Sequence, residues 1–233
     1  MTPRRSDGPE ERVDDAQRSS VLAAVSVLCA DGSRAAGTEG ASVSLSDAVR
    51  VLSPIWATDG TARMLEERQL TLGEGPCLDA VASGRPVLVE DLRTPPGGTD
   101  EWPAFVADVA DVGVRGLFAF PLQIGVIVLG TVELYRRKAG PLSGAQLGSA
   151  LETADVLGTV LLGLGSPPAA EDLLPPYRLV VHQAAGMLTV RLDVSIEEAM
   201  IRLRARAFGQ GRSIHDVAAD VVSGTMHLEE EES

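Results

Sequence analysis

Five arginines near the C-terminus are the residues whose type and spacing best suit binding chemistry. Arg202 and Arg206 are four residues apart, which places them on the same face of a helix. Guanidinium groups neutralise phosphate oxygens and form paired hydrogen bonds with them. The cationic stripe is extended by Arg191, Arg204 and Arg212. An ordinary solvent-exposed salt bridge is the open alternative for Arg202, because Glu198 precedes it by four residues.

The cysteines and histidines do not form a recognisable catalytic or metal-binding set. Cys29 and Cys77 are too few for a disulfide framework or a zinc site. We expect Cys77 to be a buried structural residue, with redox sensing as the lesser alternative. His182 could be imagined as a phosphoacceptor, but no nucleotide-binding or kinase motif accompanies it. The sequence therefore predicts no enzyme activity, no cofactor and no metal site.

Three amphipathic helices within residues 177–224 must position the arginines. The first follows two prolines, which are tolerated in a first helical turn because its N–H groups have no intrahelical partner. Apolar residues then recur every three or four positions, as on one face of a helix. The three stripes are Tyr177, Val181, Ala184 and Leu188; Ile196, Ala199, Met200, Leu203 and Ala207; and Ile214, Val217, Ala218, Val221 and Val222. Each helix alone would be marginal in water, so the stripes should pack together.

Capping residues mark the ends of the second and third helices. Ser195 and Glu198 fit a capping box, in which each side chain satisfies a free backbone donor. Gly211 suits the left-handed turn that ends a helix, and Ser213 can cap the next one. Gly186 interrupts the first helix, where glycine costs roughly 1 kcal/mol relative to alanine. Close packing against another helix is the simplest explanation for it.

The charge of the chain is distributed unevenly. The 233 residues carry a net charge of −13, which argues against nucleic acid as a partner. Residues 1–176 account for −10 and residues 225–233 for −4, whereas residues 177–224 carry six basic and five acidic side chains, or +1. The helical segment is thus the only part of the chain that is not strongly acidic, which permits contact with phosphates.

The N-terminal residues and the apolar runs bear on location. No apolar run reaches the roughly 18 residues that a membrane span needs. Residues 1–11 lack the apolar core of a signal peptide. We therefore expect a cytoplasmic protein, with a disordered N-terminus over residues 1–12.

The C-terminal pattern resembles the ANTAR domain. The resemblance rests on joint spacing across three helices, in the segments His182–Leu188, Ser195, Glu198–Ala199, Leu203–Arg204, Ala207 and Asp216–Ala218. It implies a module that binds paired RNA stem-loops in a nascent transcript and prevents terminator formation. RNA loops present unstacked bases and phosphates to such a module. The resemblance and the arginine stripe together give the RNA-binding candidates Gln183, Ala184, Gly186, Arg191, Arg202, Arg204, Arg206 and Arg212. Many family members carry lysine where this chain has Ala185, and Gln183 could supply only a neutral hydrogen bond.

The upstream sequence predicts an α+β domain built around an antiparallel sheet. The expected strands are 41–45, 49–55, 86–90, 116–124 and 126–136. The expected helices are 13–28, 61–69, 77–82, 101–111 and 142–164. Strand 116–124 is apolar on both faces, with Leu117 and Ala119 on one and Phe118, Phe120 and Leu122 on the other. Such a sheet must be covered on both sides.

This order of elements resembles the GAF domain, a small-molecule sensor fold, over roughly residues 21–164. The matching segments are Leu72–Ala80, Gly84–Val87, Trp102–Pro103, Gly113–Arg115, Phe118–Leu122 and Tyr135. In that family the sheet and its covering helices often enclose a pocket whose ligand varies widely. The resemblance implies an unidentified small-molecule ligand, with Cys77, Trp102, Phe118 and Phe120 as candidate pocket residues.

The predicted organisation is a sensor domain over residues 13–164, a proline-rich linker over 165–176, the three-helix module over 177–224 and an acidic tail over 225–233. A homodimer is expected through the helix from Leu142, where Leu147, Leu151, Ala154, Gly158 and Leu161 follow four-three spacing. The function predicted is a signal-responsive antitermination regulator.

Three alternatives remain open at this stage. A DNA-binding regulator would need base-reading side chains at the start of its third helix, which offers only Ser213, His215 and Asp216. A GAF-type reductase would need more cysteines than this chain has. A protein-interaction module that binds no nucleic acid fits the overall acidity.

Overall fold

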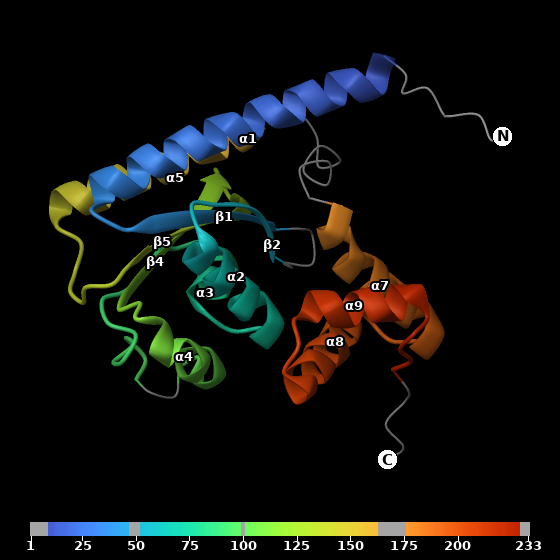
Figure 1. Ribbon diagram of the computed structural model, residues 1–233. Helices are drawn as coiled ribbons and strands as arrows, with labels where there is room; N and C mark the ends of the chain where they lie inside the picture. Colours follow the sequence, from blue (N-terminus) through green and yellow to red (C-terminus); the bar gives the residue numbers. More distant parts are fainter. Residues whose placement is uncertain (1–8, 47–51, 99–100, 163–175, 229–233) are drawn as a thin grey trace.

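A computed structural model describes residues 9–46, 52–98, 101–162 and 176–228. Its N-terminal part is the predicted α+β domain, with a five-stranded antiparallel sheet in the order β2-β1-β5-β4-β3 (Figure 1). The strands are β1 Gly40–Ser46, β2 Leu52–Ala57, β3 Val87–Val89, β4 Gly116–Ile124 and β5 Ile127–Arg136. Residues 49–51 of the second predicted strand lie outside the described residues.

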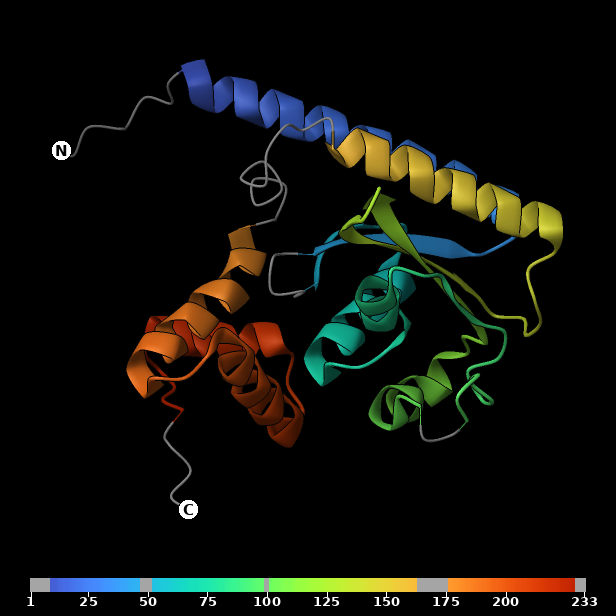
Figure 2. The same ribbon diagram turned by 180° about the vertical axis from the view of Figure 1, so that it is seen from behind.

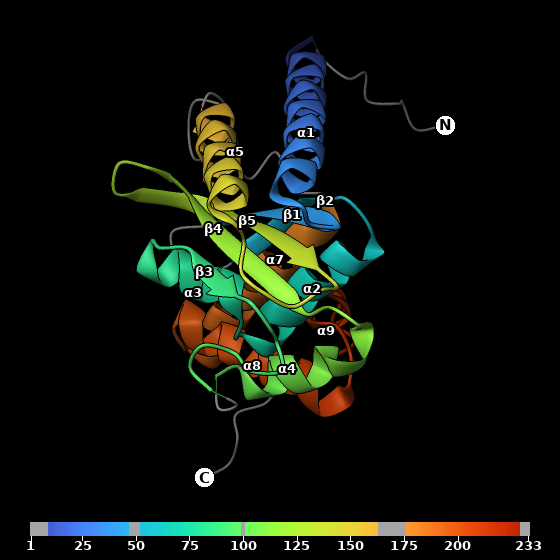
Figure 3. The ribbon, with the colours of Figure 1, turned by 90° about the vertical axis from the view of Figure 1, so that its left-hand side faces the viewer.

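Two long helices cover one face of the sheet. Helix α1 (Pro9–Ala36) begins four residues before the predicted start at Val13, and α5 (Gly144–Leu162) packs beside it (Figure 3). Their apolar residues meet Phe118, Phe120 and Leu122 of β4, none of which has exposed surface.

The other face of the sheet is covered by shorter helices. These are α2 (Gly60–Leu72), α3 (Pro76–Ser83) and α4 (Pro103–Val109), which a 3-10 turn extends over Ala110–Val112. Leu117 of β4 packs with residues of α2 and α4, and Ala119 packs with α3. The prediction that both faces of the sheet are covered is therefore confirmed.

The glycines between α2 and α3 have conformational reasons. Gly73 ends α2 with a φ of 73°, and Gly75 precedes α3 with a φ of 137°. Both angles lie where residues with a Cβ are strained. A Cβ on Gly75 would also lie 2.5 Å from side-chain atoms of Gln69. The backbone thus closes tightly around a polar side chain of α2.

The C-terminal part is the predicted three-helix unit, called here the helical module: α7 (Pro176–Leu192), α8 (Ile196–Gln210) and α9 (Ile214–Ser223), seen from behind in Figure 2. From Val181 onward, the predicted stripes form one apolar core, in which Val222 and Ile196 are only partly buried. Ser195 and Ser213 cap α8 and α9 by accepting hydrogen bonds from the amides of Glu198 and Asp216.

Two expectations for the helical module need correction. Gly186 is exposed, and a Cβ placed on it would meet nothing within 4 Å, so close packing does not explain this glycine. The polypeptide after α9 is not simply a tail, because Leu228 is buried in the module core and Met226 packs against it. Residues 229–233, residues 165–175 of the predicted linker (165–176) and residues 1–8 lie outside the described residues. Residues 9–12 of the predicted disordered N-terminus belong to α1 instead.

The predicted dimer stripe on α5 is also largely used within the domain. Ala154, Gly158 and Leu161 are buried, whereas Leu151 is 41% exposed. Across the described parts of the chain, no helix combines the length and the apolar content of a membrane span.

Candidate functional site

Arg202 forms the salt bridge that the sequence left as an alternative. Its Nε donates a hydrogen bond to Glu198 Oε1 at 2.9 Å, and the side chain is 29% exposed. The carboxylate of Glu198 therefore points along α8 toward Arg202. A partly exposed i,i+4 pair on a helix contributes only about 0.3–0.5 kcal/mol, so exchanging Glu198 for a phosphate costs Arg202 little.

Arg204 points away from Arg202 and toward the N-terminal α+β domain, for which the name sensor domain, taken from the sequence prediction, is kept only as a label. Its Nε donates to the carbonyl of Leu70 at 3.2 Å, near the C-terminal end of α2. A Cβ added to Gly73 would lie only 3.0 Å from Arg204 Cδ. The absence of a side chain at Gly73 therefore allows Arg204 to approach the end of α2. Burial lowers the pKa of the Arg204 guanidinium, which remains charged at neutral pH. The three arginines of α8 therefore do not form one stripe.

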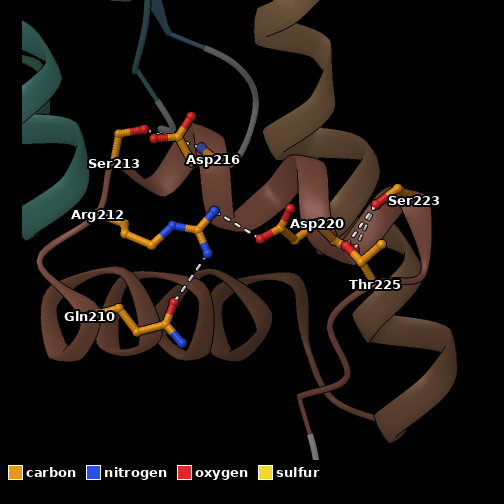
Figure 4. A network of polar contacts seen from close by, with 7 residues as sticks. All are labelled: Gln210, Arg212, Ser213, Asp216, Asp220, Ser223 and Thr225. Atoms are coloured by element: carbon orange, nitrogen blue, oxygen red, sulfur yellow. Dashed lines mark hydrogen bonds and ion pairs between the residues drawn. The ribbon is translucent and has the colours of Figure 1, made fainter.

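Arg212 connects the end of α8 to α9 (Figure 4). Its Nη2 lies 2.8 Å from Asp220 Oδ2, and its Nη1 donates to Gln210 Oε1 at 3.3 Å. Both members of the ion pair are about one-third exposed. Arg212 thus links α8 and α9 within the helical module.

The remaining RNA-binding candidates divide by burial. Arg206, Gln183 and Arg191 are exposed, and Arg191 Nη1 lies 3.2 Å from Nδ1 of His227. Ala184 has no exposed surface and belongs to the module core. It cannot contact RNA in this conformation, because its methyl group is enclosed by the other helices. Ala185 is also buried, so the position that carries lysine in many family members here contributes to packing.

Exposed apolar residues were missed by the sequence reasoning. Ile201 is 55% and Phe208 66% exposed on α8, and Val190 is 86% exposed on α7. Ile201 and Phe208 are seven residues apart and share a helix face, which differs from the buried stripe of Met200, Leu203 and Ala207. That second apolar spacing was the available signal. The exposed side of α8 thus combines arginines with apolar groups.

The four candidate pocket residues of the sensor do not line one pocket. Phe118 and Phe120 face α1 and α5, whereas Cys77 packs with Ala119 on the opposite face of the sheet. Trp102 lies on that opposite face too, where its Nε1 donates to Asp79 Oδ2 at 3.0 Å. Side chains of β4 alternate between faces, and this separates the two phenylalanines from the other candidates.

A buried polar cluster occupies the sheet face beneath α2 and α3. Glu133 Oε2 accepts hydrogen bonds from Gln69 Nε2 at 2.7 Å and from Cys77 Sγ at 3.0 Å. Gln69 Oε1 accepts from the amide of Cys77 at 2.8 Å. We call Gln69, Cys77 and Glu133 the polar cluster. Only Cys77 was a sequence candidate; a glutamate between the apolar residues Val132 and Leu134 was the available signal.

Burial controls the protonation of the polar cluster. It raises the pKa of Glu133 to about 7, although the hydrogen bonds from Cys77 and Gln69 favour the charged form. Burial and the neighbouring carboxylates Glu133 and Glu66 raise the pKa of the Cys77 thiol well above its usual value. The thiolate is the reactive form of cysteine, so Cys77 fits the structural interpretation rather than redox sensing. The described residues contain no group of three or more potential metal ligands.

The helical module contacts the sensor beside α2. Ile214 donates its amide hydrogen to Thr71 Oγ1 at 3.4 Å, and Ser53 Oγ lies 3.1 Å from His182 Nε2. A cleft of about 160 Å³ lies at this junction and is lined from both sides, with Thr71 from α2 and His215 from α9 among its residues.

Comparison with known proteins agrees with this division. Residues 177–222 match the ANTAR domain. The GAF domain region of a protein from Geobacter sulfurreducens is similar to the N-terminal part, with a TM-score of 0.52 and 15% identity over 63% of this chain and 96% of that one. A GAF domain of a phosphoenolpyruvate-protein phosphotransferase from Coxiella burnetii gives 0.48 and 13%, over 65% and 90%. No curated protein sequence matches. The chain therefore combines a GAF fold with a C-terminal ANTAR domain.

Proposed function

We propose that this protein is a signal-responsive transcription antitermination regulator. Its ANTAR domain binds paired RNA stem-loops in nascent transcripts, and its GAF domain controls that binding. The observation that carries the proposal is the ANTAR match over residues 177–222, which coincides with the only part of the chain that is not strongly acidic. Arg191, Arg202 and Arg206 supply cationic groups for phosphate contacts on this domain.

The orientation of α9 supports RNA over duplex DNA. A recognition helix reads the major groove with residues near its N-terminus. In this protein Ser213 caps α9, and the amide of Ile214 and the side chain of His215 face the sensor. In this conformation the start of α9 is therefore engaged within the molecule, and its polar side chains Ser213, His215 and Asp216 are a poor base-reading set even when that contact is released.

A homodimer would increase the RNA affinity of a helical module that carries a net charge of only +1. Linking two modules adds to the affinity for paired stem-loops without any new contact. Apolar residues on the outer sides of the α1–α5 layer support self-association there: Val27 is 61%, Leu151 41% and Leu162 51% exposed. A second copy of this layer is the partner proposed for them.

A gel-shift comparison tests the proposal. The full-length protein should retard an RNA with two stem-loops and should not retard duplex DNA of the same sequence. The logarithm of the RNA affinity should fall linearly with the logarithm of the salt concentration, and the slope gives the number of phosphate contacts. Equal binding to both nucleic acids would contradict RNA recognition.

Variants locate the contact surface. R202A and R206A should each weaken RNA binding about tenfold, as expected for loss of a charge-assisted contact of 1–2 kcal/mol. The matched control is R34A, which removes an exposed arginine from an intrahelical ion pair with Asp31 in the sensor. Unchanged affinity in R202A and R206A would remove both residues from the site.

A protein-interaction role is the second candidate, and the exposed Ile201 and Phe208 favour it. Both functions would use the exposed side of α8. A folded protein that binds neither RNA nor DNA, at low salt and at micromolar concentration, would support this second candidate over the first.

A further inference from the structure

The C-terminal end of α2 is part of two cores at once. Leu65 packs in the sensor core, whereas Leu70, one turn and a half further on, belongs to the apolar core of the ANTAR domain and is only 8% exposed. Figures 1 and 2 show this end of α2 directed at α8 and α9. The two domains are thus joined by an apolar contact as well as by the polypeptide between them.

Arg204 completes this contact from the ANTAR side. The last carbonyl groups of a helix lack intrahelical partners and carry partial negative charge, which favours a cation there. Arg204 Nε donates to one of these groups, the carbonyl of Leu70, at 3.2 Å. The guanidinium therefore binds a helix end of the sensor in place of an external anion.

Two further hydrogen bonds fix the orientation of the domains. The Ile214 amide donates to Thr71 Oγ1, and Ser53 of β2 bonds His182 of α7. The contact thus involves α7, α8 and α9 together with α2 and β2. An arrangement held at three helices resists both translation and rotation.

We propose that α2 holds the ANTAR domain in a docked state that withholds Arg204 from RNA. The inference rests on the RNA-binding function proposed above and specifies how that function is restrained. Arg202 and Arg206 remain accessible in the docked state, so the docked protein binds RNA weakly. Undocking releases Arg204, and the apparent affinity for RNA is the affinity of the undocked state multiplied by the fraction of molecules that are undocked.

The polar cluster provides the route from the sensor to this contact. Gln69 directly precedes Leu70, and its side chain is hydrogen bonded to Glu133 and to the amide of Cys77. A signal that breaks the Gln69–Glu133 bond therefore acts one residue from the docking contact. A shift of the α2 backbone at Gln69 would move the neighbouring Leu70 carbonyl relative to Arg204.

The test uses L70S in the full-length protein, with the two-stem-loop RNA as ligand. Leu70 packs in the ANTAR core rather than in the sensor core, so the substitution acts mainly on docking. L70S should bind the RNA about tenfold more tightly than the wild type. Hydrogen exchange of the Ile214 amide, measured without RNA, should accelerate in the same variant because the bond to Thr71 is lost.

Two controls accompany L70S. V126S replaces a 97% exposed valine in the β4–β5 turn and should change neither measurement. T71V removes the acceptor for the Ile214 amide and is the second variant, to be used if L70S does not fold. It should raise the RNA affinity about threefold and accelerate the exchange of the Ile214 amide.

The outcomes distinguish this inference from the proposed function. Faster exchange with unchanged RNA affinity would show that docking does not restrain binding and would overturn the inference alone. Unchanged exchange at Ile214 would overturn the docking role of Leu70. If neither the wild type nor the variant binds the RNA, the proposed function fails and this inference fails with it, even where exchange accelerates.

Discussion

The sensor and the ANTAR domain use buried polar groups in opposite ways. Among the described residues, every buried polar or charged side chain lies between Ser33 and Arg136, in the sensor. The buried side chains of residues 180–228 are all apolar, and the hydroxyls of Ser195 and Ser213 serve at helix ends. Buried polar groups must be satisfied by specific partners, whereas an apolar core is held mainly by volume and shape.

This difference indicates how the two domains divide their roles. The polar cluster places a titratable group, Glu133, inside the core of the N-terminal domain. The ANTAR core, within the described residues, offers no such group, and its state depends on what contacts its surface.

A cavity in the ANTAR core should have the largest effect. L203A removes a side chain with no exposed surface and should lower the free energy of unfolding by about 3 kcal/mol. Urea denaturation followed by circular dichroism measures the loss. The loss should be independent of pH between 5 and 8, because the buried groups of this domain do not titrate. A pH-dependent loss would contradict the contrast.

Glu133 should make the sensor more stable in acid. Its pKa is raised from 4.5 to about 7 in the folded protein, so the folded state holds the proton more tightly than the unfolded chain. The stabilisation that Glu133 adds to the free energy of unfolding is fully present below pH 4.5 and is lost as the pH rises to about 7. At about 1.4 kcal/mol per pKa unit, it amounts to at most about 3 kcal/mol.

The comparison with E133Q isolates this contribution, since glutamine cannot ionise. Melting temperatures of the wild type and E133Q, measured between pH 4.5 and 8, should diverge in favour of the variant as the pH rises. The isosteric amide keeps an acceptor for Gln69 and Cys77. Parallel pH profiles would show that ionisation of Glu133 does not lower the stability of the folded protein, which would contradict the prediction.

A cap variant should have an intermediate effect on the ANTAR domain. Ser213 Oγ accepts a hydrogen bond from the Asp216 amide at 3.1 Å. S213A should lower the free energy of unfolding by about 1 kcal/mol, because the donor at the start of α9 loses its partner. S223A, at the other end of the same helix, is the matched control and should stay within about 0.5 kcal/mol. Equal effects would argue against a specific cap.

The Arg212–Asp220 pair should contribute least. Its members are 36% and 35% exposed, and exposed ion pairs are worth about 0.5 kcal/mol or less. A double-mutant cycle of R212Q and D220N, in denaturant at two salt concentrations, measures the coupling. A coupling above about 1 kcal/mol would mean that the network in Figure 4 is a main support of the domain.

Local features of the sequence predicted most of the fold. The stripes through Val181, Leu203 and Val217 and the caps Ser195, Gly211 and Ser213 depend on spacings within a few residues, and all are confirmed. The strands were found from runs of apolar residues for the same reason. Most element ends shifted by a few residues, but α1 extends four residues before and eight residues beyond the predicted 13–28, because Gly32 does not end the helix.

The site was less predictable because its contacts join distant parts of the chain. The direction of Arg204 depends on Leu70, 134 residues away, and helix spacing alone groups it with the other arginines. The polar cluster depends on the bond between Gln69 and Glu133, which are 64 residues apart. Gly186 is exposed where the sequence predicts close packing, because its position in the helix does not reveal which face it lies on.

The position of Leu70 in the ANTAR core limits the modularity of this protein. A chimaera that joins the three helices to a different N-terminal domain would leave the site that Leu70 occupies in the ANTAR core unfilled, and Arg204 would lack the Leu70 carbonyl as its acceptor. A functional transplant must therefore also carry over the last turn of α2, or supply a leucine of equivalent reach. If the proposed docking holds, swaps made at the polypeptide between the domains should yield folded proteins whose ANTAR domain is no longer docked.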